Sequence, residues 1–427
     1  MWELFEQALL ERFGHGTLFA WQREVIAAAW PKGSRVLLVA PTGGGKSLTY
    51  QLPATLLAGT TLVISPLVAL MEDQVASLDR RGIPGTWLAS TIPPDVRRER
   101  EAWMRRGRYK IVYVAPERLT YEPFLRTLAR VPIPLVAVDE AHCIVHWGRE
   151  FRPEYARLGG ALERLDVPRV MACTATATPA VRHEIVAGLR FDRTRMREIL
   201  CGFARPNLHL AARWISGARA AATETECALR SALGEPARPA GGAIVYMATR
   251  RATEQMALGL RRRRWNVAPY HAGLEPDVRA ETNARFAAGT LDVVVATNAF
   301  GMGIDRADVR LVVHGQPPPS LDAYYQEVGR AGRDGLAAHG LLLCSRADVA
   351  LRRRFCEMPS NGQPPSAASV DRAWWMFCEV LNFLDERTCR HDSLMRYFGD
   401  HGAQTGGCGR CDVCIARSAR GVTAPAA

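Results

Sequence analysis

The hydrophobic positions divide the chain into two regions of similar construction and a third that differs from both. Short runs of apolar and β-branched residues recur in the first two regions, and a turn or a helix-like segment follows each run. In the first region the runs are RVLLVA (35–40), TTLVIS (60–65), KIVYVA (110–115), LVAVDE (135–140) and RVMACTA (169–175). In the second region they are GAIVYMA (242–248), LDVVVAT (291–297), VRLVVHG (309–315) and GLLLCS (340–345). Runs of this kind are typical of parallel strands buried on both faces, so the pattern predicts two α/β doubly wound parallel sheets.

The segments between and after these runs predict helices. Residues 216–241 are rich in Ala, Gly, Pro and Arg, which favours a helix followed by a loose loop. Beyond residue 350, LRRRFCEM and RAWWMFCEVLNFL are typical of helices and predict a third, small helical module. We therefore expect one lobe at 1–205, a second at 206–350, the helical module at 351–416 and a disordered tail at 417–427.

Composition and charge narrow the class of protein. The chain has 427 residues, of which 48% are hydrophobic, as expected for a globular protein of more than one domain. A formal net charge of +12 favours a polyanionic partner, although a basic surface that only maintains solubility has the same balance. No apolar run approaches the length of a membrane span, and the N-terminus lacks the basic flank of a secretion signal. We expect a cytoplasmic, soluble monomer with no membrane partner, in which the scattered cysteines stay reduced.

The stretch APTGGGKS (40–47) has the features of a phosphate-binding loop. It lies between a predicted strand and a predicted helix, and it matches the pattern G-x-x-x-x-G-K-[ST] except for Ala40 at the first position. Lysine occurs only at Lys32, Lys46 and Lys110, so a lysine in this motif is informative in a chain that otherwise uses arginine. Lys46 can reach the β- and γ-phosphates of ATP, and the Ser47 hydroxyl can ligate Mg²⁺. The predicted nucleotide-binding residues of the loop are Thr42, Gly43, Gly44, Gly45, Lys46 and Ser47.

Two adjacent acids complete the chemistry that this loop requires. Asp139 and Glu140 follow the apolar run at 135–138 in the stretch VDEAHCIVHWGREFRPEY (138–155). A carboxylate at the end of a strand, downstream of a phosphate loop, is the pattern of a second Mg²⁺ ligand. Asp139 fits that role, and Glu140 fits the residue that orients or deprotonates the attacking water.

In combination, the motifs resemble the RecQ type of superfamily 2 ATP-dependent DNA helicase. The resemblance covers about residues 5–415 and is carried by these stretches, in order: APTGGGKSLTYQLPA, SPLVALMEDQV (65–75), YVAPERL (113–119), DEAHCIVHWGREFRPEY, CTATATP (173–179), FARPNL (203–208), ATNAFGMGIDRADVRLVVH (296–314) and YYQEVGRAGRDG (324–335). It implies two RecA-like lobes and 3′-to-5′ movement driven by ATP hydrolysis that single-stranded DNA stimulates. It also implies a role in DNA repair and recombination, and partly duplex DNA as a further partner in the nucleoid.

The resemblance also assigns residues to the nucleotide. Gln326, Arg330 and Arg333 are expected to face it across the cleft between the lobes, with Arg333 as the arginine finger that stabilises charge on the transferring phosphoryl group. Asp305 is expected to contact the ribose. In HGTLFAWQ (15–22), which corresponds to the base pocket of the family, Gln22 is retained. His15 and Phe19 stand where relatives have Tyr and Arg, so we expect ATP to be preferred with looser discrimination between bases.

The aromatic and basic residues after the acid pair resemble the aromatic-rich loop of the family, which touches single-stranded DNA. The expected contacts are Trp147, Arg149, Phe151 and Arg152, because ring stacking tolerates any base and arginine reaches phosphate. A Trp and Phe core cluster is the alternative interpretation. Val145, His146 and Arg149 depart from the family pattern, which puts the efficiency of coupling to hydrolysis in question. Further residues expected to make polar contacts with the DNA backbone are Ser90, Thr91, Thr249, Arg250 and Thr297.

Four cysteines near the C-terminus have the spacing of a metal site. Cys389 precedes Cys408, Cys411 and Cys414, and the last three have C-x₂-C spacing. The same spacing also suits an iron–sulfur cluster. Relatives carry zinc at this point, so the resemblance favours a structural Zn²⁺ that cross-links the helical module.

One feature limits the predicted unwinding activity. The chain ends shortly after Cys414, whereas long relatives continue into a winged-helix and a further helical (HRDC) domain, so we expect weaker unwinding of long duplexes. Two rival functions share much of the pattern. One is a single-strand DNA-binding protein without productive hydrolysis, and the other is an RNA helicase.

Overall fold

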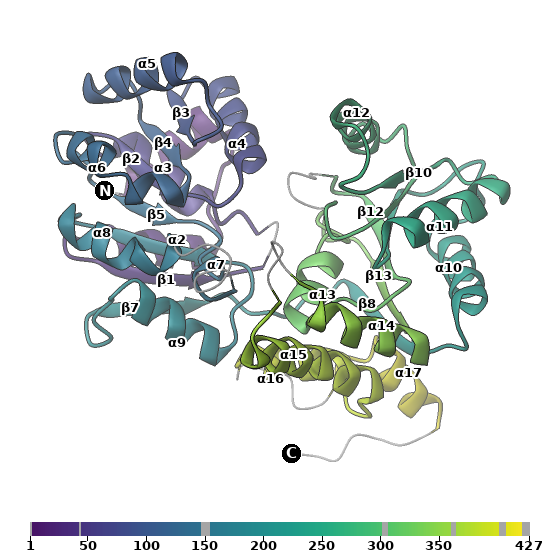
Figure 1. Cartoon of the computed structure of the whole chain (residues 1–427). Coiled ribbons are helices and arrows are strands. Elements are labelled where there is room, and N and C mark those ends of the chain that lie inside the picture. The colour runs from purple at the N-terminus through teal and green to yellow at the C-terminus, as the bar shows by residue number, and fades with distance from the viewer. Residues whose placement is uncertain are drawn as a thin grey trace. The chain divides into compact units, whose positions relative to one another are not determined.

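The computed structural model places the chain in two compact units, Met1–Gly202 and Phe203–Ala427. It describes residues 2–41, 44–146, 154–300, 306–359, 364–400 and 407–420. Each unit is built on a parallel sheet, which confirms the predicted fold class. Figure 1 shows the first unit in purple to teal and the second in teal to yellow. Among the described residues, no helix combines the length and apolar character that a membrane span requires.

The first unit holds a seven-stranded parallel sheet in the order β3-β4-β2-β5-β6-β1-β7. Its strands are β1 (Arg35–Val39), β2 (Thr61–Ile64), β3 (Gly85–Leu88), β4 (Ile111–Val114), β5 (Val136–Val138), β6 (Val170–Thr174) and β7 (Met196–Leu200). The helices and single turns are α1 (Trp2–Ala8), η1 (Leu9–Phe13), α2 (Ala20–Ala29), α3 (Leu48–Leu56), α4 (Val68–Arg80), α5 (Pro94–Arg105), η2 (Pro116–Thr120), α6 (Glu122–Leu128), α7 (Cys143–His146), η3 (Tyr155–Arg157), α8 (Leu158–Arg164) and α9 (Pro179–Gly188).

The second unit holds a six-stranded parallel sheet in the order β10-β11-β9-β12-β13-β8. Its strands are β8 (Leu208–Trp214), β9 (Gly242–Tyr246), β10 (Val267–Tyr270), β11 (Val293–Ala296), β12 (Val309–His314) and β13 (Ala338–Cys344). Its helices are α10 (Ala218–Leu233), α11 (Arg250–Arg262), α12 (Pro276–Ala287), α13 (Leu321–Val328), α14 (Arg346–Glu357), α15 (Ala367–Asp385), α16 (Arg390–Tyr397) and α17 (Asp412–Ala419).

The interior strands are those that the apolar runs predicted. Residues such as Val36, Leu38, Val63, Val293 and Val313 are fully buried between helices on both faces of their sheets. Burial of such a side chain stabilises the fold by about 1.5–3 kcal/mol. Because the strands are parallel, their carboxyl ends meet at one edge of each sheet, and the loops that carry the sequence motifs follow these ends.

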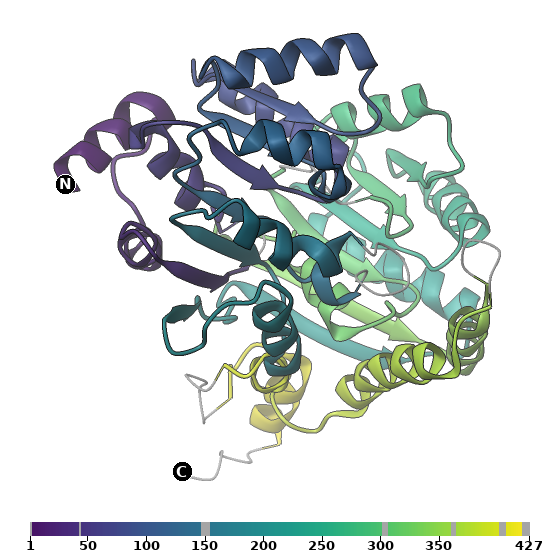
Figure 2. The ribbon, with the colours of Figure 1, turned by 60° about the vertical axis from the view of Figure 1, so that its left-hand side comes forward.

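The C-terminal helices pack against β8 within the second unit. Asp412 accepts a hydrogen bond from the backbone N–H of Ala212 at 2.9 Å, and the Trp214 indole donates to Asp385 at 2.7 Å. The ring of Phe203 stacks on that of Phe398, with the centroids 4.5 Å apart. Figure 2 shows these helices, coloured yellow-green to yellow, gathered along one side of the unit. The C-terminal helices therefore belong to the same compact unit as the second sheet.

Candidate nucleotide and metal sites

The phosphate loop joins the carboxyl end of β1 to the first turn of α3. Lys46 donates its ammonium hydrogens to the carbonyl oxygens of Ala40 at 3.0 Å and Pro41 at 3.2 Å, so the cation is held over the loop. Ser47 lies at the N-terminus of α3, where helix N–H groups point outward and favour anions. Gly45 has a φ of 79°, and a Cβ there would lie 2.7 Å from the Gln22 amide nitrogen. The loop therefore requires glycine at this position. Thr42 and Gly43 lie outside the described residues.

Gln22 fixes this loop to α2. Its amide donates to the Gly45 carbonyl at 3.2 Å and accepts from the Phe19 backbone N–H at 3.0 Å, which caps α2. The Gln22 side chain is buried, whereas Phe19 is 65% exposed and His15 is also exposed. The structure thus places Gln22 beside the phosphate loop and leaves the rings of Phe19 and His15 exposed.

The acid pair lies at the carboxyl end of β5. The Tyr50 hydroxyl, on α3, donates to Asp139 Oδ2 at 3.2 Å, and the Glu140 backbone N–H donates to Asp139 Oδ1 at 3.0 Å. Burial, assisted by the negative charge of Glu140, raises the pKa of Asp139 to about 6, while Lys46 opposes the shift. Glu140 itself has a φ of 48°, an uncommon conformation for a residue with a side chain. A cation beside this carboxylate would return it to the charged form.

A second contact links the acids to β6. His142 Nδ1 lies 3.3 Å from Glu140 Oε2 and 3.0 Å from Thr174 Oγ1. The Thr174 hydroxyl donates to the Thr176 carbonyl, so it accepts from His142. Burial alone lowers the pKa of His142, but Cys143 and Glu140 outweigh burial and raise that pKa well above its ordinary value. When protonated, the imidazole neutralises part of the charge of Glu140.

In the second unit, the loop after α13 carries the candidate arginines. Gln326 lies on α13, and Arg330 and Arg333 follow the end of that helix. Both arginines act electrostatically on Tyr246 at the end of β9: burial raises the pKa of Tyr246 to about 12, and the two guanidinium groups oppose that shift. The structure thus brings the two arginines to the same edge of the second sheet.

The loop that carries these arginines is held by the motif FARPNL. The Arg205 guanidinium donates to the carbonyls of Gly329 at 3.0 Å and Ala331 at 2.8 Å. The Asn207 amide donates to the carbonyls of Gly332 at 2.8 Å and Leu336 at 2.9 Å. Carbonyls on both sides of Arg330 and before Arg333 are therefore fixed from a segment more than a hundred residues earlier in the chain.

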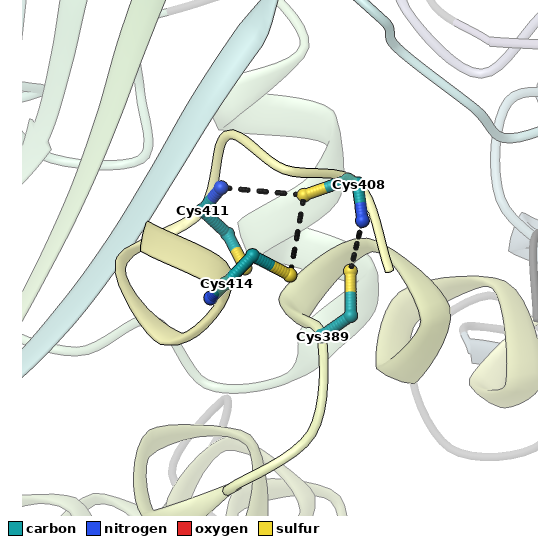
Figure 3. A group of neighbouring side chains, drawn as sticks. All are labelled: Cys389, Cys408, Cys411 and Cys414. Atoms are coloured by element: carbon teal, nitrogen blue, oxygen red, sulfur yellow. Dashed lines mark hydrogen bonds between the residues drawn. The ribbon is translucent and has the colours of Figure 1, made fainter. Parts of the chain in front are cut away.

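The four cysteines near the C-terminus converge on one point. Their sulfur atoms all lie within 4.8 Å of one another (Figure 3). Backbone N–H groups of Cys408, Cys411 and Cys414 donate to sulfur atoms of the same group, at 3.2–3.4 Å. A tetrahedral Zn²⁺ with bonds of about 2.3 Å separates its sulfur ligands by about 3.8 Å, so the donor set fits one such ion. His391 lies outside the group, with Nε2 3.1 Å from the Leu208 carbonyl oxygen.

Comparisons with known proteins match all three parts of the chain. The model of DEAD/DEAH box helicases matches residues 19–185, that of the helicase conserved C-terminal domain matches 227–335, and that of RecQ zinc-binding matches 346–415. The ATP-dependent DNA helicase RecQ of Bacillus subtilis (strain 168) is 37% identical over 420 residues, which cover 98% of this chain and 68% of that protein. The chain belongs to the RecQ family of ATP-dependent DNA helicases. The RecQ of Pasteurella multocida (strain Pm70) is also 37% identical, over 94% of this chain and 61% of that protein.

Solved structures agree with this RecQ chain in fold. The DUF1998 helicase MrfA bound to DNA aligns with 80% of the chain and 50% of its own length, at a TM-score of 0.63 and 19% identity. The helicase Lhr of Mycobacterium smegmatis, bound to ssDNA and AMP-PNP, aligns with 85% of the chain and 50% of its own length, at a TM-score of 0.60 and 22% identity. At these identities the likeness concerns the fold alone.

The residues predicted to touch DNA fall into two groups. Ser90 follows β3 and donates to Glu117 at 3.2 Å, with Thr91 exposed beside it. Thr249 caps α11 after β9, Arg250 begins that helix, and Thr297 follows β11. All these positions lie at carboxyl ends of strands. Trp147, Arg149, Phe151 and Arg152 lie outside the described residues, as does Asp305.

Several residues of the site were not predicted from the sequence. They are Tyr50, His142, Thr174, Arg205 and Asn207. Tyr50 is four residues after Lys46, so the helical period could have placed it on the same face of α3. The other four act through partners in another motif, and their pairing becomes visible only in the folded chain.

Proposed function

We propose that this RecQ-family chain hydrolyses ATP when single-stranded DNA is bound and uses the energy to move 3′-to-5′ along that strand. The observation that carries this proposal is the buried Asp139 carboxylate, held by Tyr50 from the helix that follows the phosphate loop. Lys46 and Asp139 act electrostatically on one another, so one bound ligand can contact both side chains. This is the arrangement that binding and cleaving a nucleoside triphosphate requires.

The chemical roles follow from the positions of the groups. Lys46 binds phosphate oxygens once they replace the Ala40 and Pro41 carbonyls that it now contacts. Glu140, whose Oε2 lies 3.3 Å from His142 Nδ1, orients the attacking water. Ser47 and Asp139 are the residues that would hold Mg²⁺, which neutralises charge on the phosphates when bound.

Arg333 is proposed to stabilise charge on the transferring phosphoryl group, with Gln326 and Arg330 in supporting contacts. The fixed carbonyls of Gly329 and Ala331 support this role, because an arginine that acts on a transition state needs a rigid loop. An effect of about 10³–10⁵ on the rate is typical of such arginines. Asp305 is proposed to contact the ribose.

The base is proposed to lie beside His15, Phe19 and Gln22. Phe19 offers an exposed ring without the cation that an arginine would add, which supports a preference for ATP with weak discrimination against other bases. A comparison of kcat/KM for ATP and GTP tests this, and a preference for ATP above about a hundredfold would contradict it.

DNA contact is proposed for the carboxyl edges of both sheets and for the aromatic loop at 147–152. The backbone-directed residues Ser90, Thr91, Thr249, Arg250 and Thr297 would contact phosphates, and the aromatic rings of the loop would stack on bases. A role in DNA repair and recombination, on single-stranded and partly duplex DNA in the nucleoid, is part of the same proposal.

The test measures the release of phosphate from ATP with and without a single-stranded DNA oligonucleotide. The unmodified chain is expected to respond to DNA more strongly than to RNA of the same sequence, and Lys46→Ala is expected to lose the activity while keeping DNA binding. Equal rates with and without nucleic acid would remove the proposed coupling. A stronger response to RNA would favour the RNA helicase instead, and DNA binding without hydrolysis would favour a passive single-strand binder.

A further inference from the structure

Two neighbouring helix ends in the first unit carry the same sequence pattern. Helix α4 ends in Arg80-Arg81-Gly82 and α5 ends in Arg105-Arg106-Gly107. In each, the glycine adopts a positive φ, 64° for Gly82 and 67° for Gly107. In each, the N–H of the next residue donates back to the last turn of the helix: Ile83 to Leu78 at 3.0 Å and Arg108 to Trp103 at 3.1 Å. These are the bonds of a Schellman cap, so both turns are rigid.

The two turns lead into adjacent strands at one edge of the sheet. These strands are β3 and β4, which pair from Gly85 opposite Ile111, and the Lys110 N–H donates to the Pro84 carbonyl at 2.8 Å. Figure 1 shows α4, α5 and β3 together at one end of the first unit. This is the amino edge of the strands. The four-residue β4 separates it by roughly 13 Å from the carboxyl edge, where Ser90 and the acid pair lie.

Charge and exposed aromatic surface gather at this amino edge. Arg80, Arg105, Arg106 and Arg108 are all exposed, and Trp103 on the last turn of α5 is 44% exposed. The Trp103 ring lies 6.3 Å from that of Tyr109, at an interplanar angle of 32°. Within the described part of the chain, Arg105, Arg106 and Arg108 form no hydrogen bond or ion pair through their side chains. The nearby Glu101 is already paired with Arg118 at 2.6 Å.

The helix dipole accounts for only part of this pattern. Cations in the last turn of a helix are favourable by about 0.3–1 kcal/mol each, which explains Arg80 and Arg105. It does not explain Arg108, which follows the cap, nor an indole that keeps nearly half of its surface in water. Unpaired arginines beside an exposed ring are instead the features of a single-strand binding surface, where arginine meets phosphate and the ring stacks on a base.

We propose that Trp103, Arg105, Arg106 and Arg108 form a second contact site for single-stranded nucleic acid, at the opposite edge of the sheet from the predicted one. The inference does not depend on ATP hydrolysis, and its test uses no nucleotide, so it can fail independently of the proposed function.

The test is binding of a fluorescently labelled oligothymidylate to the full chain over a series of salt concentrations. The triple variant Arg105→Gln, Arg106→Gln, Arg108→Gln is expected to reduce the slope of log K against log salt by about 2, because three phosphate contacts are lost. Trp103→Ala is expected to weaken binding roughly tenfold, and Trp103→Phe to restore most of the loss. The matched control is Arg238→Gln, Arg262→Gln, Arg264→Gln, which removes the same charge from exposed positions in the second unit.

The outcomes separate cleanly. An unchanged slope in the first triple variant, or the same change in both triple variants, would overturn the site. So would a Trp103→Ala variant that binds as tightly as the parent. A loss confined to blunt duplex DNA would show that the patch meets a different partner and would overturn the single-strand assignment. An unfolding temperature equal to that of the parent, measured for each variant, excludes misfolding as the cause of weaker binding.

Discussion

The Tyr50 hydroxyl donates a hydrogen bond to Asp139 Oδ2 at 3.2 Å, which joins the helix after the phosphate loop to the acid at the end of β5. The bond favours the charged carboxylate and lowers the pKa of Asp139, against the larger effect of burial. Burial in turn raises the pKa of Tyr50 well above its ordinary value, so the phenol stays a donor throughout the physiological range. Tyr50 therefore positions and tunes the acid without taking part in the chemistry.

Replacing Tyr50 by Phe removes the donor and preserves the ring. The charged form of Asp139 is then less stable. Mg²⁺ binding therefore has to contribute more free energy to ionise the carboxyl group. We expect half-maximal DNA-stimulated hydrolysis to require roughly tenfold more Mg²⁺, with activity recovering at high Mg²⁺. Tyr325→Phe is the matched control, because Tyr325 is a buried tyrosine of the second unit whose hydroxyl donates to the Phe203 carbonyl at 2.9 Å. Equal Mg²⁺ dependence in both variants would show that the Tyr50 bond is not used.

Arg205 offers a test of the loop that carries the candidate arginines. Its guanidinium bridges the carbonyls of Gly329 and Ala331, a fork that the single ammonium group of a lysine cannot reproduce. We expect Arg205→Lys to lower kcat for DNA-stimulated ATP hydrolysis roughly tenfold with little change in KM, because ground-state binding does not need the rigid loop. Arg213→Lys, on the exposed pair with Glu224, is expected to leave both constants unchanged. A rise in KM at constant kcat would contradict this role for the loop.

The strands that the apolar pattern predicted are the interior strands, and those that it missed are the four edge strands β3, β7, β8 and β10. An interior strand of a parallel sheet has helices on both faces and a paired strand on each side, so its sequence is a continuous apolar run. An edge strand is partly exposed. In β7, MREIL, only Ile199 is buried, and in β3, GTWL, buried and half-buried residues alternate. Runs of apolar residues cannot mark such strands.

The site divides in a similar way. Lys46, Asp139 and the cysteine cluster could be predicted because each belongs to a short contiguous motif with its own chemistry. The contact of His142 with Thr174 and that of Arg205 with Ala331 could not, because they depend on which strands and loops become neighbours in three dimensions. The sequence marks CTATATP and FARPNL as motifs but does not identify their partners.

The cysteine cluster predicts a metal that stabilises the second unit. Cys389→Ser removes one of four sulfur donors, so we expect zinc content, measured by atomic absorption, to fall well below one ion per chain. The module packs on β8 through Asp412, which is also held by Arg390 at 3.0 Å, so loss of the ion is expected to lower the unfolding temperature of the second unit. Cys227→Ser, an exposed cysteine on α10, is the control and should change neither quantity. Iron and sulfide in the parent protein instead of zinc would point to the alternative cluster.

The pair of Arg306 and Asp308 predicts how stability depends on pH. Arg306 is buried, donates to both carboxylate oxygens of Asp308, at 2.7 and 3.2 Å, and also donates to the Leu291 carbonyl at 2.7 Å. The guanidinium lowers the pKa of Asp308 in the folded chain, so the unfolded chain binds the proton more readily. The stability that the pair contributes is therefore present above the unfolded pKa near 4 and is lost as the pH falls through the folded value.

Asp308→Asn keeps the shape of the side chain and removes its charge. Because Asp308 is half exposed, we expect the free energy of unfolding at pH 7 to fall by only about 1–2 kcal/mol, measured by urea denaturation followed by circular dichroism. The difference between parent and variant should shrink as the pH is lowered below about 4, where the parent carboxylate also loses its charge. Asp371→Asn, on the exposed start of α15, controls for the change in net charge. A difference that stays constant from pH 7 to pH 3 would mean that Asp308 stabilises the turn by its shape, not by its charge.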